Sequence, residues 1–161
     1  SGFDLNVIAF DPYAPGTLFT GLGAERVDLQ SLFRRADVVS IHTPALPATR
    51  GMITAGLLAT LKQGAALINT SRASIIDQPG LAAVISERKD ITAILDLVDM
   101  EDRSGATLCS LPNVMVTPHI AGSMGNEWKR MSDRIVEAFT QWKDGGSPDG
   151  EVTGEMLETM A

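Results

Sequence analysis

Short apolar runs alternate along this chain with segments of helical spacing, and this alternation restricts the possible folds more than any other feature. An apolar run of about five residues between helical segments is typical of a strand in a parallel sheet with helical crossovers. Run 37–42 is continuously apolar in its middle, which predicts a strand covered on both faces. The pattern predicts an α/β fold with a doubly wound parallel sheet. The five strands expected as neighbours are 6–10, 37–42, 65–69, 91–97 and 114–117.

Capping residues place the helices between these strands. Asp28, Thr54 and Asp77 can each accept a hydrogen bond from the first turn of a helix. Gly64 stands where a left-handed residue ends a helix. Residues 25–27 predict a short edge strand. The helices expected from these signals are 29–35, 54–62 and 77–88.

A longer helix is expected to open at Ser123 and to stop at Gly145-Gly146. Its apolar residues are spaced by three and four, so they share one face, and packing in the core is the simplest role for them. Docking of another domain and self-association are the alternatives. The residues of this face are Trp128, Met131, Ile135, Phe139 and Trp142. Residues 147–161 are rich in Gly, Pro and acidic residues and predict a loose tail, with one short helix near 155–160.

Charge and composition exclude several classes of partner. The formal net charge is −7, from 13 basic and 20 acidic residues, and no block of Lys and Arg is present. Nucleic acid and anionic membranes both require a positive surface, so neither is expected as a partner. The single cysteine, Cys109, and the two histidines predict no disulfide and no metal site. No signal peptide is evident at residues 1–4, and we expect a soluble, cytoplasmic domain.

Four residues after predicted strands could carry chemistry, although each has an ordinary structural alternative. Asp11 could bind ribose hydroxyls or form a plain Asp-Pro turn. Arg72 could hold a carboxylate with two hydrogen bonds or be an exposed surface residue. His119 could exchange a proton near neutral pH or be a satisfied loop residue. Glu101 could assist that histidine or belong to a solvated acidic loop.

Their positions together favour the functional interpretation. Arg72, Glu101 and His119 follow the ends of consecutive strands, and Asp96 would be costly if it were buried there without a partner. Ligands bind at the carboxyl ends of the strands in open α/β sheets. An arginine, a glutamate and a histidine at that edge suit carbonyl chemistry, whereas His42, at another strand end, is expected to be structural.

Five stretches, in order between residues 7 and 123, resemble the D-2-hydroxyacid dehydrogenase family, which includes D-3-phosphoglycerate dehydrogenase, and the resemblance in order and spacing extends over nearly all of residues 3–143. They are VIAFDPY (7–13), ADVVSIHTPALPATRGMI (36–53), LKQGAALINTSRASIID (61–77), ILDLVDME (94–101) and LPNVMVTPHIAGS (111–123). The resemblance implies a Rossmann-like NAD-binding domain, a hydride transfer between NAD(H) and a 2-hydroxy or 2-keto acid, and a homodimer.

The resemblance also implies roles for individual residues. Arg72, Glu101 and His119 match the catalytic arginine, glutamate and histidine, and Asp11 matches the acid that binds the adenosine ribose, which favours NAD over NADP. The other positions that match cofactor contacts, besides Arg72 and His119, are Thr43, Pro44, Thr70, Ser71, Asp96, Ala121 and Gly122. Two positions depart from the family pattern: Ala73 replaces a glycine and Asp102 replaces a proline.

The glycine-rich phosphate-binding turn that opens a dinucleotide-binding fold is not found, because Gly21 and Gly23 follow the Asp-Pro strand end. We therefore expect residues 1–146 to form an NAD-binding domain that lacks its first βα unit, with 147–161 as a tail. Such a fragment is expected to be inactive alone. A corepressor-like, NAD-sensing interaction module on the same fold is the alternative function.

Overall fold

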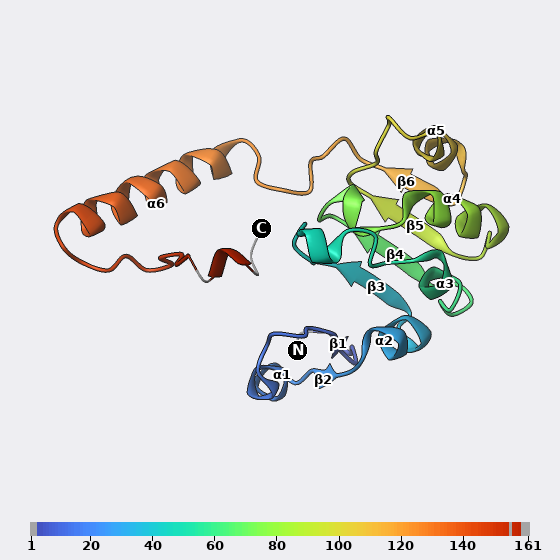
Figure 1. The fold of residues 1–161 in the computed structure, drawn as a ribbon, viewed down its shortest axis with the longest axis horizontal. Helices are drawn as coiled ribbons and strands as arrows, with labels where there is room; N and C mark the ends of the chain where they lie inside the picture. The colour runs from blue at the N-terminus through green and yellow to red at the C-terminus, as the bar shows by residue number, and fades with distance from the viewer. Residues whose placement is uncertain (1–2, 155, 159–161) are drawn as a thin grey trace.

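The computed structural model describes residues 3–154 and 156–158 and contains two parallel sheets (Figure 1). The smaller sheet pairs β1 (Ile8–Ala9) with β2 (Glu25–Arg26). The larger sheet has four strands in sequence order, and every neighbouring pair is parallel. Its strands are β3 (Val38–Ile41), β4 (Ala66–Asn69), β5 (Thr92–Leu95) and β6 (Val114–Val116). The predicted α/β fold with a parallel sheet is confirmed.

The capping residues act as the sequence predicts. Asp28 accepts from the Ser31 amide at 2.8 Å, and Asp77 accepts from the Gly80 amide at 3.2 Å. Thr54 likewise caps its helix, although that helix is shorter than expected, and Gly64 has a φ of +74°. The helices are α1 (Gly16–Leu22), α2 (Leu29–Arg35), α3 (Ala55–Leu58), α4 (Gln78–Glu87), α5 (Arg103–Ser110) and α6 (Asn126–Lys143). The sequence patterns did not predict α1 or α5.

Three short 3-10 helices complete the described elements, at Pro47–Thr49, Ala73–Ile75 and Met156–Glu158. The last of them lies within the short helix expected near 155–160, of which residues 155 and 159–161 lie outside the described residues. None of the helices in the described ranges is long and apolar enough to cross a membrane.

The core lies between one face of the four-stranded sheet and the layer of α3, α4 and α5 (Figure 1). Leu58 from α3, Ile85 from α4 and Leu108 from α5 are completely buried there, against Leu67 of β4. Burial of these side chains removes apolar surface from water and is the main source of stability for the four-stranded sheet and its helix layer. The layer therefore fixes the sheet whose carboxyl edge carries the candidate residues.

Strand β3 is not covered on both faces, and that prediction was wrong. Val39 and Ile41 are buried in the core, but Val38 is 57% exposed and Ser40 is exposed as well. The reason is that α3, α4 and α5 pack against one face of the sheet, while β3 forms one of its edges. A continuous apolar run thus does not reveal how many layers cover a strand.

Strand β1 is not a neighbour of β3, which corrects the expected row of five strands. Its ladder runs to β2 alone: the Glu25 amide donates to the Val7 carbonyl at 2.9 Å, and the Val27 amide donates to the Ala9 carbonyl at 3.0 Å. The pairing of β1 with β2 could not be separated from a pairing with β3 by apolar pattern, because both alternatives use the same short runs.

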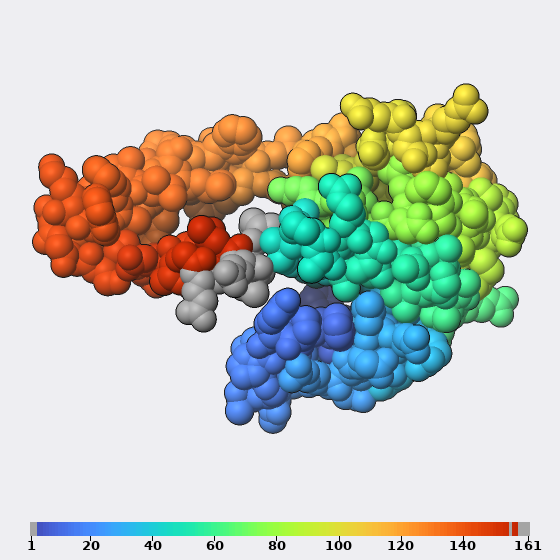
Figure 2. Space-filling view, in the orientation of Figure 1, coloured from blue at the N-terminus to red at the C-terminus, as the bar shows by residue number. Residues whose placement is uncertain are grey.

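Helix α6 stands out from the rest of the chain, and Figure 2 shows it as an extended arm. Its apolar face was expected to pack in the core, but Trp128 is 68% exposed, and Ile135, Phe139 and Trp142 are exposed too. Ion pairs within the helix, such as Lys129 with Asp133 at 2.6 Å, support it locally. The described residues therefore leave this face available.

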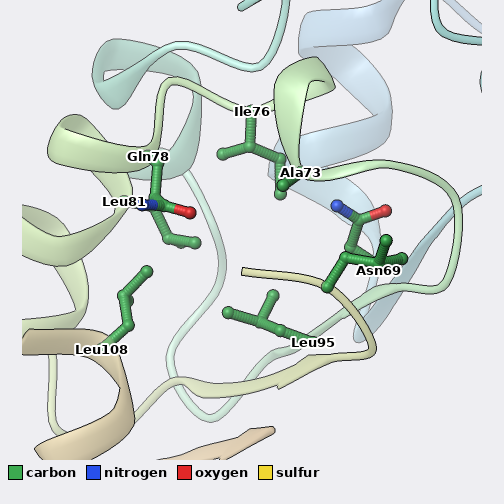
Figure 3. A pocket seen from close by; sticks show the side chains of 8 residues that line it. Asn69, Ala73, Ile76, Gln78, Leu81, Leu95 and Leu108 are labelled. Atoms are coloured by element: carbon green, nitrogen blue, oxygen red, sulfur yellow. The ribbon is translucent and has the colours of Figure 1, made fainter. Parts of the chain in front are cut away.

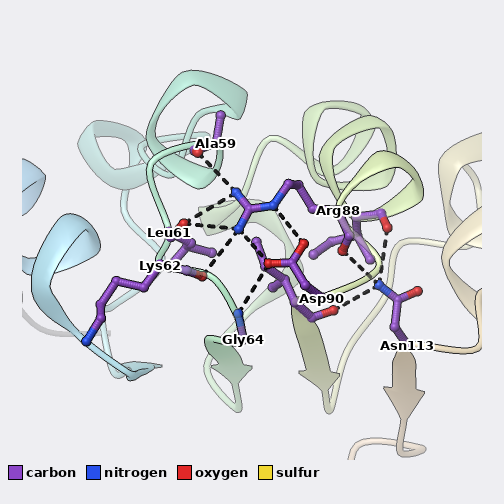
Figure 4. A network of polar contacts seen from close by, with 9 residues as sticks. Ala59, Leu61, Lys62, Gly64, Arg88, Asp90 and Asn113 are labelled. Carbon is purple, nitrogen blue, oxygen red and sulfur yellow. Dashed lines mark hydrogen bonds and ion pairs between the residues drawn. The ribbon is translucent and has the colours of Figure 1, made fainter.

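At the amino end of the larger sheet, Arg88 joins α4 to the end of α3 (Figure 4). Its guanidinium donates to the Asp90 carboxylate at 2.8 and 2.7 Å and to the Leu61 carbonyl at 3.3 Å. The Arg88 hydrogen bonds hold the pKa of Asp90 well below its ordinary value, and a bond from the Gly64 amide adds to this effect. The Arg88 guanidinium thus satisfies a carbonyl after α3 and holds the turn that follows α4.

We expect Asp90→Asn to lower the melting temperature at neutral pH and to matter less in acid. Because the pKa of Asp90 is lowered on folding, its stabilising contribution is present above the ordinary value of 3.8 and is lost as the pH falls further. Thermal unfolding at about pH 7 and about pH 2 measures the difference. Asp37→Asn, which breaks an exposed pair with Lys62, is the matched control. Equal losses for the two variants would contradict the expectation.

Candidate functional site

An open cleft of about 270 Å³ lies at the carboxyl ends of β3 and β4. Two loops form it, one after each strand, and five of the predicted cofactor-contacting residues line it. The lining residues are His42, Thr43, Pro44, Ala45, Thr70, Ser71 and Arg72. The structure thus places the residues of the two motifs, which are nearly thirty positions apart in the sequence, on one concave surface.

The loop that carries Arg72 is held by Asn69, the buried last residue of β4. The Asn69 side chain accepts from the Ser71 amide at 3.0 Å and donates to the Arg72 carbonyl at 2.9 Å. The Ser71 hydroxyl donates to the Ile41 carbonyl at 3.0 Å and so ties this loop to the end of β3. The backbone around Arg72 is therefore fixed from beneath the cleft.

The Arg72 side chain is exposed. Its Nη1 donates to the Ser71 carbonyl at 2.8 Å, and it forms no ion pair with a carboxylate of the described residues. A guanidinium presents several donors in a planar array that matches a carboxylate. Arg72 is thus a suitable anchor for an anionic substrate beside the cleft.

The loop that carries His119 is held by Asp96, directly after β5. Asp96 is 2% exposed, and its carboxylate accepts from the Thr117 hydroxyl at 2.5 Å and from the amides of Ile120 and Ala121 at 2.9 and 3.0 Å. The Thr117 hydrogen bond first, and then the two amides, lower the pKa of Asp96. A buried carboxylate at this position requires partners, and they are a hydroxyl and two backbone amides of its own chain.

His119 has a φ of +55°, which is uncommon for a residue with a side chain. The His119 amide donates to the Asp96 carbonyl at 2.9 Å, while the Asp96 carboxylate accepts from Thr117 and Ile120. Asp96 therefore holds the strained residue and the chain before and after it. Strained backbone that the surrounding structure enforces is common at functional sites. The imidazole itself is exposed.

Glu101 lies in the loop after β5, and its carboxylate is exposed. Its amide donates to the Asp99 carboxylate at 3.0 Å. Within the described ranges no hydrogen bond or ion pair joins the Glu101 carboxylate to His119 or to Arg72. The three residues therefore follow neighbouring strands of one sheet, but no hydrogen bond or ion pair joins their side chains in the described structure.

Asp11 follows β1 in the smaller sheet and does not line the cleft. Its Oδ1 accepts from the amides of Tyr13 and Ala14 at 2.8 and 3.0 Å, which is the plain turn weighed as its alternative role. Ala121 and Gly122, beyond His119, are exposed. His42 lines the cleft and is bonded to the Ser40 hydroxyl through Nε2 at 2.8 Å.

Comparison with known proteins identifies the family. Residues 1–121 match the family described as D-isomer specific 2-hydroxyacid dehydrogenase, NAD binding domain. The chain belongs to this family. The resemblance drawn from the five sequence stretches is thus confirmed, and NAD is the cofactor that the family description names.

Relatives in the dehydrogenase family span greater lengths than this chain. A hydroxypyruvate reductase from Thermotoga maritima is 36% identical over 138 residues, which are 84% of this chain and 44% of that protein. A D-3-phosphoglycerate dehydrogenase from Methanocaldococcus jannaschii is 34% identical over 83% of this chain and 26% of its own length. The chain therefore spans less than half the length of these two relatives.

A solved structure supports the same assignment. The NAD-complexed D-isomer specific 2-hydroxyacid dehydrogenase from Lactobacillus delbrueckii ssp. bulgaricus superposes with a TM-score of 0.78 and is 28% identical. The match covers 92% of this chain and 48% of that chain. The Rossmann-like class expected for this dehydrogenase-family chain is confirmed.

Sequence reasoning missed Asn69 among the residues that shape the site of this dehydrogenase-family domain. The available signal is an amide side chain at the end of an otherwise apolar run, 66–69. A buried polar group requires hydrogen-bond partners, and the loop that follows is the nearest source of them.

We expect Asp96→Asn to loosen the His119 loop without unfolding the sheet. An amide offers one acceptor oxygen where the carboxylate offers two, so the bond to the Ala121 or Ile120 amide is lost. Hydrogen exchange followed by NMR should show faster exchange at those two amides and unchanged exchange in β4. Unchanged protection of Ile120 and Ala121 would show that Asp96 does not hold the loop.

Proposed function

We propose that this chain forms the cofactor-binding part of an NAD-dependent enzyme that interconverts a 2-hydroxy acid and its 2-keto acid. The observation that carries the proposal is Arg72, which lines the cleft, is exposed and forms no ion pair with the described residues. It follows β4, and Glu101 and His119 follow the next two strands of the same sheet. Family membership and the carboxyl-edge position support it. The proposal concerns the intact protein.

The cleft fits part of a dinucleotide. Its volume, about 270 Å³, lies near the lower end of ligand pockets, and its hydroxyl and amide groups suit a polar ligand. Thr43, Pro44 and the segment 70–72 would hold the cofactor there, with Ala121 and Gly122 beyond the histidine. Asp11, outside the cleft, would bind a more distant part, the adenosine ribose, and would disfavour a phosphate there. Bound NADH supplies the hydride that reduces the substrate carbonyl carbon.

The side chains around the cleft would supply binding and proton transfer. Arg72 binds the substrate carboxylate with two parallel hydrogen bonds and so orients the neighbouring carbonyl. His119, when protonated, donates a proton to the carbonyl oxygen during reduction and removes it in the reverse direction. Glu101 stabilises the imidazolium that forms when the histidine is protonated. Asp96 retains its hydrogen bonds within the chain and keeps the His119 loop in place.

We expect His119→Ala in the intact protein to lower kcat for 2-keto acid reduction by about 100-fold or more, which is the usual scale for losing a general acid. Reduction is followed by the loss of NADH absorbance with a panel of 2-keto acids. The control is Asp37→Asn, which changes an exposed residue at the amino end of β3, away from the cleft, and leaves proton transfer intact.

Full activity of His119→Ala would remove this residue from the mechanism. If the wild-type intact protein reduces none of the acids but binds NADH in a calorimetric titration, the corepressor-like role becomes the better explanation. That outcome would contradict the proposed enzyme.

We also propose a homodimer in the cytoplasm. The exposed apolar face of α6, with Phe139 and Trp142 in contact at a ring distance of 5.9 Å, supports self-association because such faces are usually covered. Light scattering on the intact protein should give twice the chain mass, and Phe139→Asp should shift it toward the monomer. A monomeric wild type would contradict this proposal.

A further inference from the structure

Gln78 lies in the first turn of α4 and is 8% exposed, although glutamine is ordinarily a surface residue. Its Nε2 donates to the Asp99 carbonyl at 2.9 Å and to the Ser104 hydroxyl at 3.0 Å. Its Oε1 accepts from the Asp99 amide at 2.7 Å. One side-chain amide thus pairs with both backbone groups of a single residue, 21 positions away.

The apolar surroundings of Gln78 strengthen these hydrogen bonds. Figure 3 shows its side chain beside Leu81, at a small cavity that Leu95 and Leu108 also line. In such an apolar environment hydrogen bonds are strong, and a backbone group left without its partner is costly. The Asp99 backbone can leave Gln78 only by giving up both bonds.

Asp99 in turn fixes the start of the segment that carries Glu101. Its Oδ1 accepts from the Glu101 amide at 3.0 Å. On the other side of Glu101, Asp102 accepts from the Ser104 amide at 2.7 Å and from the Ser104 hydroxyl at 2.6 Å. Both anchors meet at Gln78, which bonds to the backbone of one and to the serine held by the other.

A second contact restricts the Asp99 backbone. Gly105, in the first turn of α5, lies so close to Asp99 that a Cβ at this position would overlap the Asp99 carbonyl oxygen. The Asp99 backbone is therefore confined between the amide of Gln78 and the glycine of α5. The Glu101 carboxylate forms no hydrogen bond or ion pair with the described residues, so its position depends on this confinement.

We propose that Gln78 is a positioning residue for Glu101, and that it sets how strongly this carboxylate acts on His119. The inference rests on the proposed function, in which Glu101 stabilises the His119 imidazolium. The attraction between a carboxylate and an imidazolium weakens with distance and with exposure to water. Releasing the Asp99 backbone therefore weakens the action of the Glu101 carboxylate on His119, although Gln78 bonds to neither residue.

The test follows the His119 imidazole by NMR titration of the intact protein, with the pH profile of kcat/KM measured on the same variants. Glu101→Gln should lower the pKa of His119 by about half a unit or more. Gln78→Leu should shift it in the same direction, and the double variant should show no further shift. Gly105→Ala, which displaces Asp99 from the opposite side, should reproduce the effect, and it decides the matter if Gln78→Leu does not fold.

Asn113→Leu is the matched control. Asn113 is another side-chain amide that bonds to backbone, through donations to the carbonyls of Ile85, Arg88 and Ile91, at the opposite end of the sheet (Figure 4). Its loss should lower stability and leave the His119 titration unchanged. An equal shift in Asn113→Leu would overturn the positioning role.

The two proposals fail in different ways. If Glu101→Gln leaves the pKa of His119 unchanged, the carboxylate does not act on the histidine. The positioning role of Gln78 is then overturned, and the proposed function loses the role of Glu101. If Glu101→Gln shifts the pKa but Gln78→Leu and Gly105→Ala do not, the proposed function stands and Gln78 is merely structural.

Discussion

Buried polar side chains that bond to loop backbone are the constraint on which the candidate site depends. Three of them each hold one loop, and each loop carries one residue of the proposed mechanism. Asn69 holds the Arg72 loop, Asp96 holds the His119 loop and Gln78 holds the Glu101 loop. Burying such groups is favourable only when their hydrogen bonds are made, so the loops and the core must form together. The positions of the exposed functional residues are thus set from inside the sheet and helix layer.

Signals that act within a few residues were read correctly from the sequence. Asp28, Thr54 and Asp77 cap the helices they precede because an N-cap needs only the next turn of its own chain. Helix α5 was missed because its segment contains Gly105 and little apolar surface. It forms with Asp102 as its cap, and its glycine permits contact with the Asp99 backbone. That contact belongs to tertiary structure, which local propensity does not describe.

The candidate site divides in the same manner. Motif order predicted Arg72, Glu101 and His119 as site residues, and each of them follows a strand of the same parallel sheet. Their mutual contact could not be predicted, and the described structure does not form it. Asn69 and Gln78 were missed because most of their partners are backbone groups, which no residue pattern encodes. The exposure of Val38 and of the α6 face was misjudged for a related reason, since coverage depends on what packs there and not on the apolar run itself.

The local arrangement around His119 shows why a site can be exposed and still be well defined. A φ of +55° costs free energy for a residue with a Cβ, and three acceptors of Asp96 that bond around it compensate for that cost. The Asp96 carboxylate accepts hydrogen bonds from the Thr117 hydroxyl and from two backbone amides. These bonds lower its pKa and so favour its charged form. The imidazole remains in water and can exchange protons, while its backbone cannot relax. Rigidity of the loop and accessibility of the ring therefore come from different atoms of the same segment, which is the combination that proton transfer to a bound substrate requires.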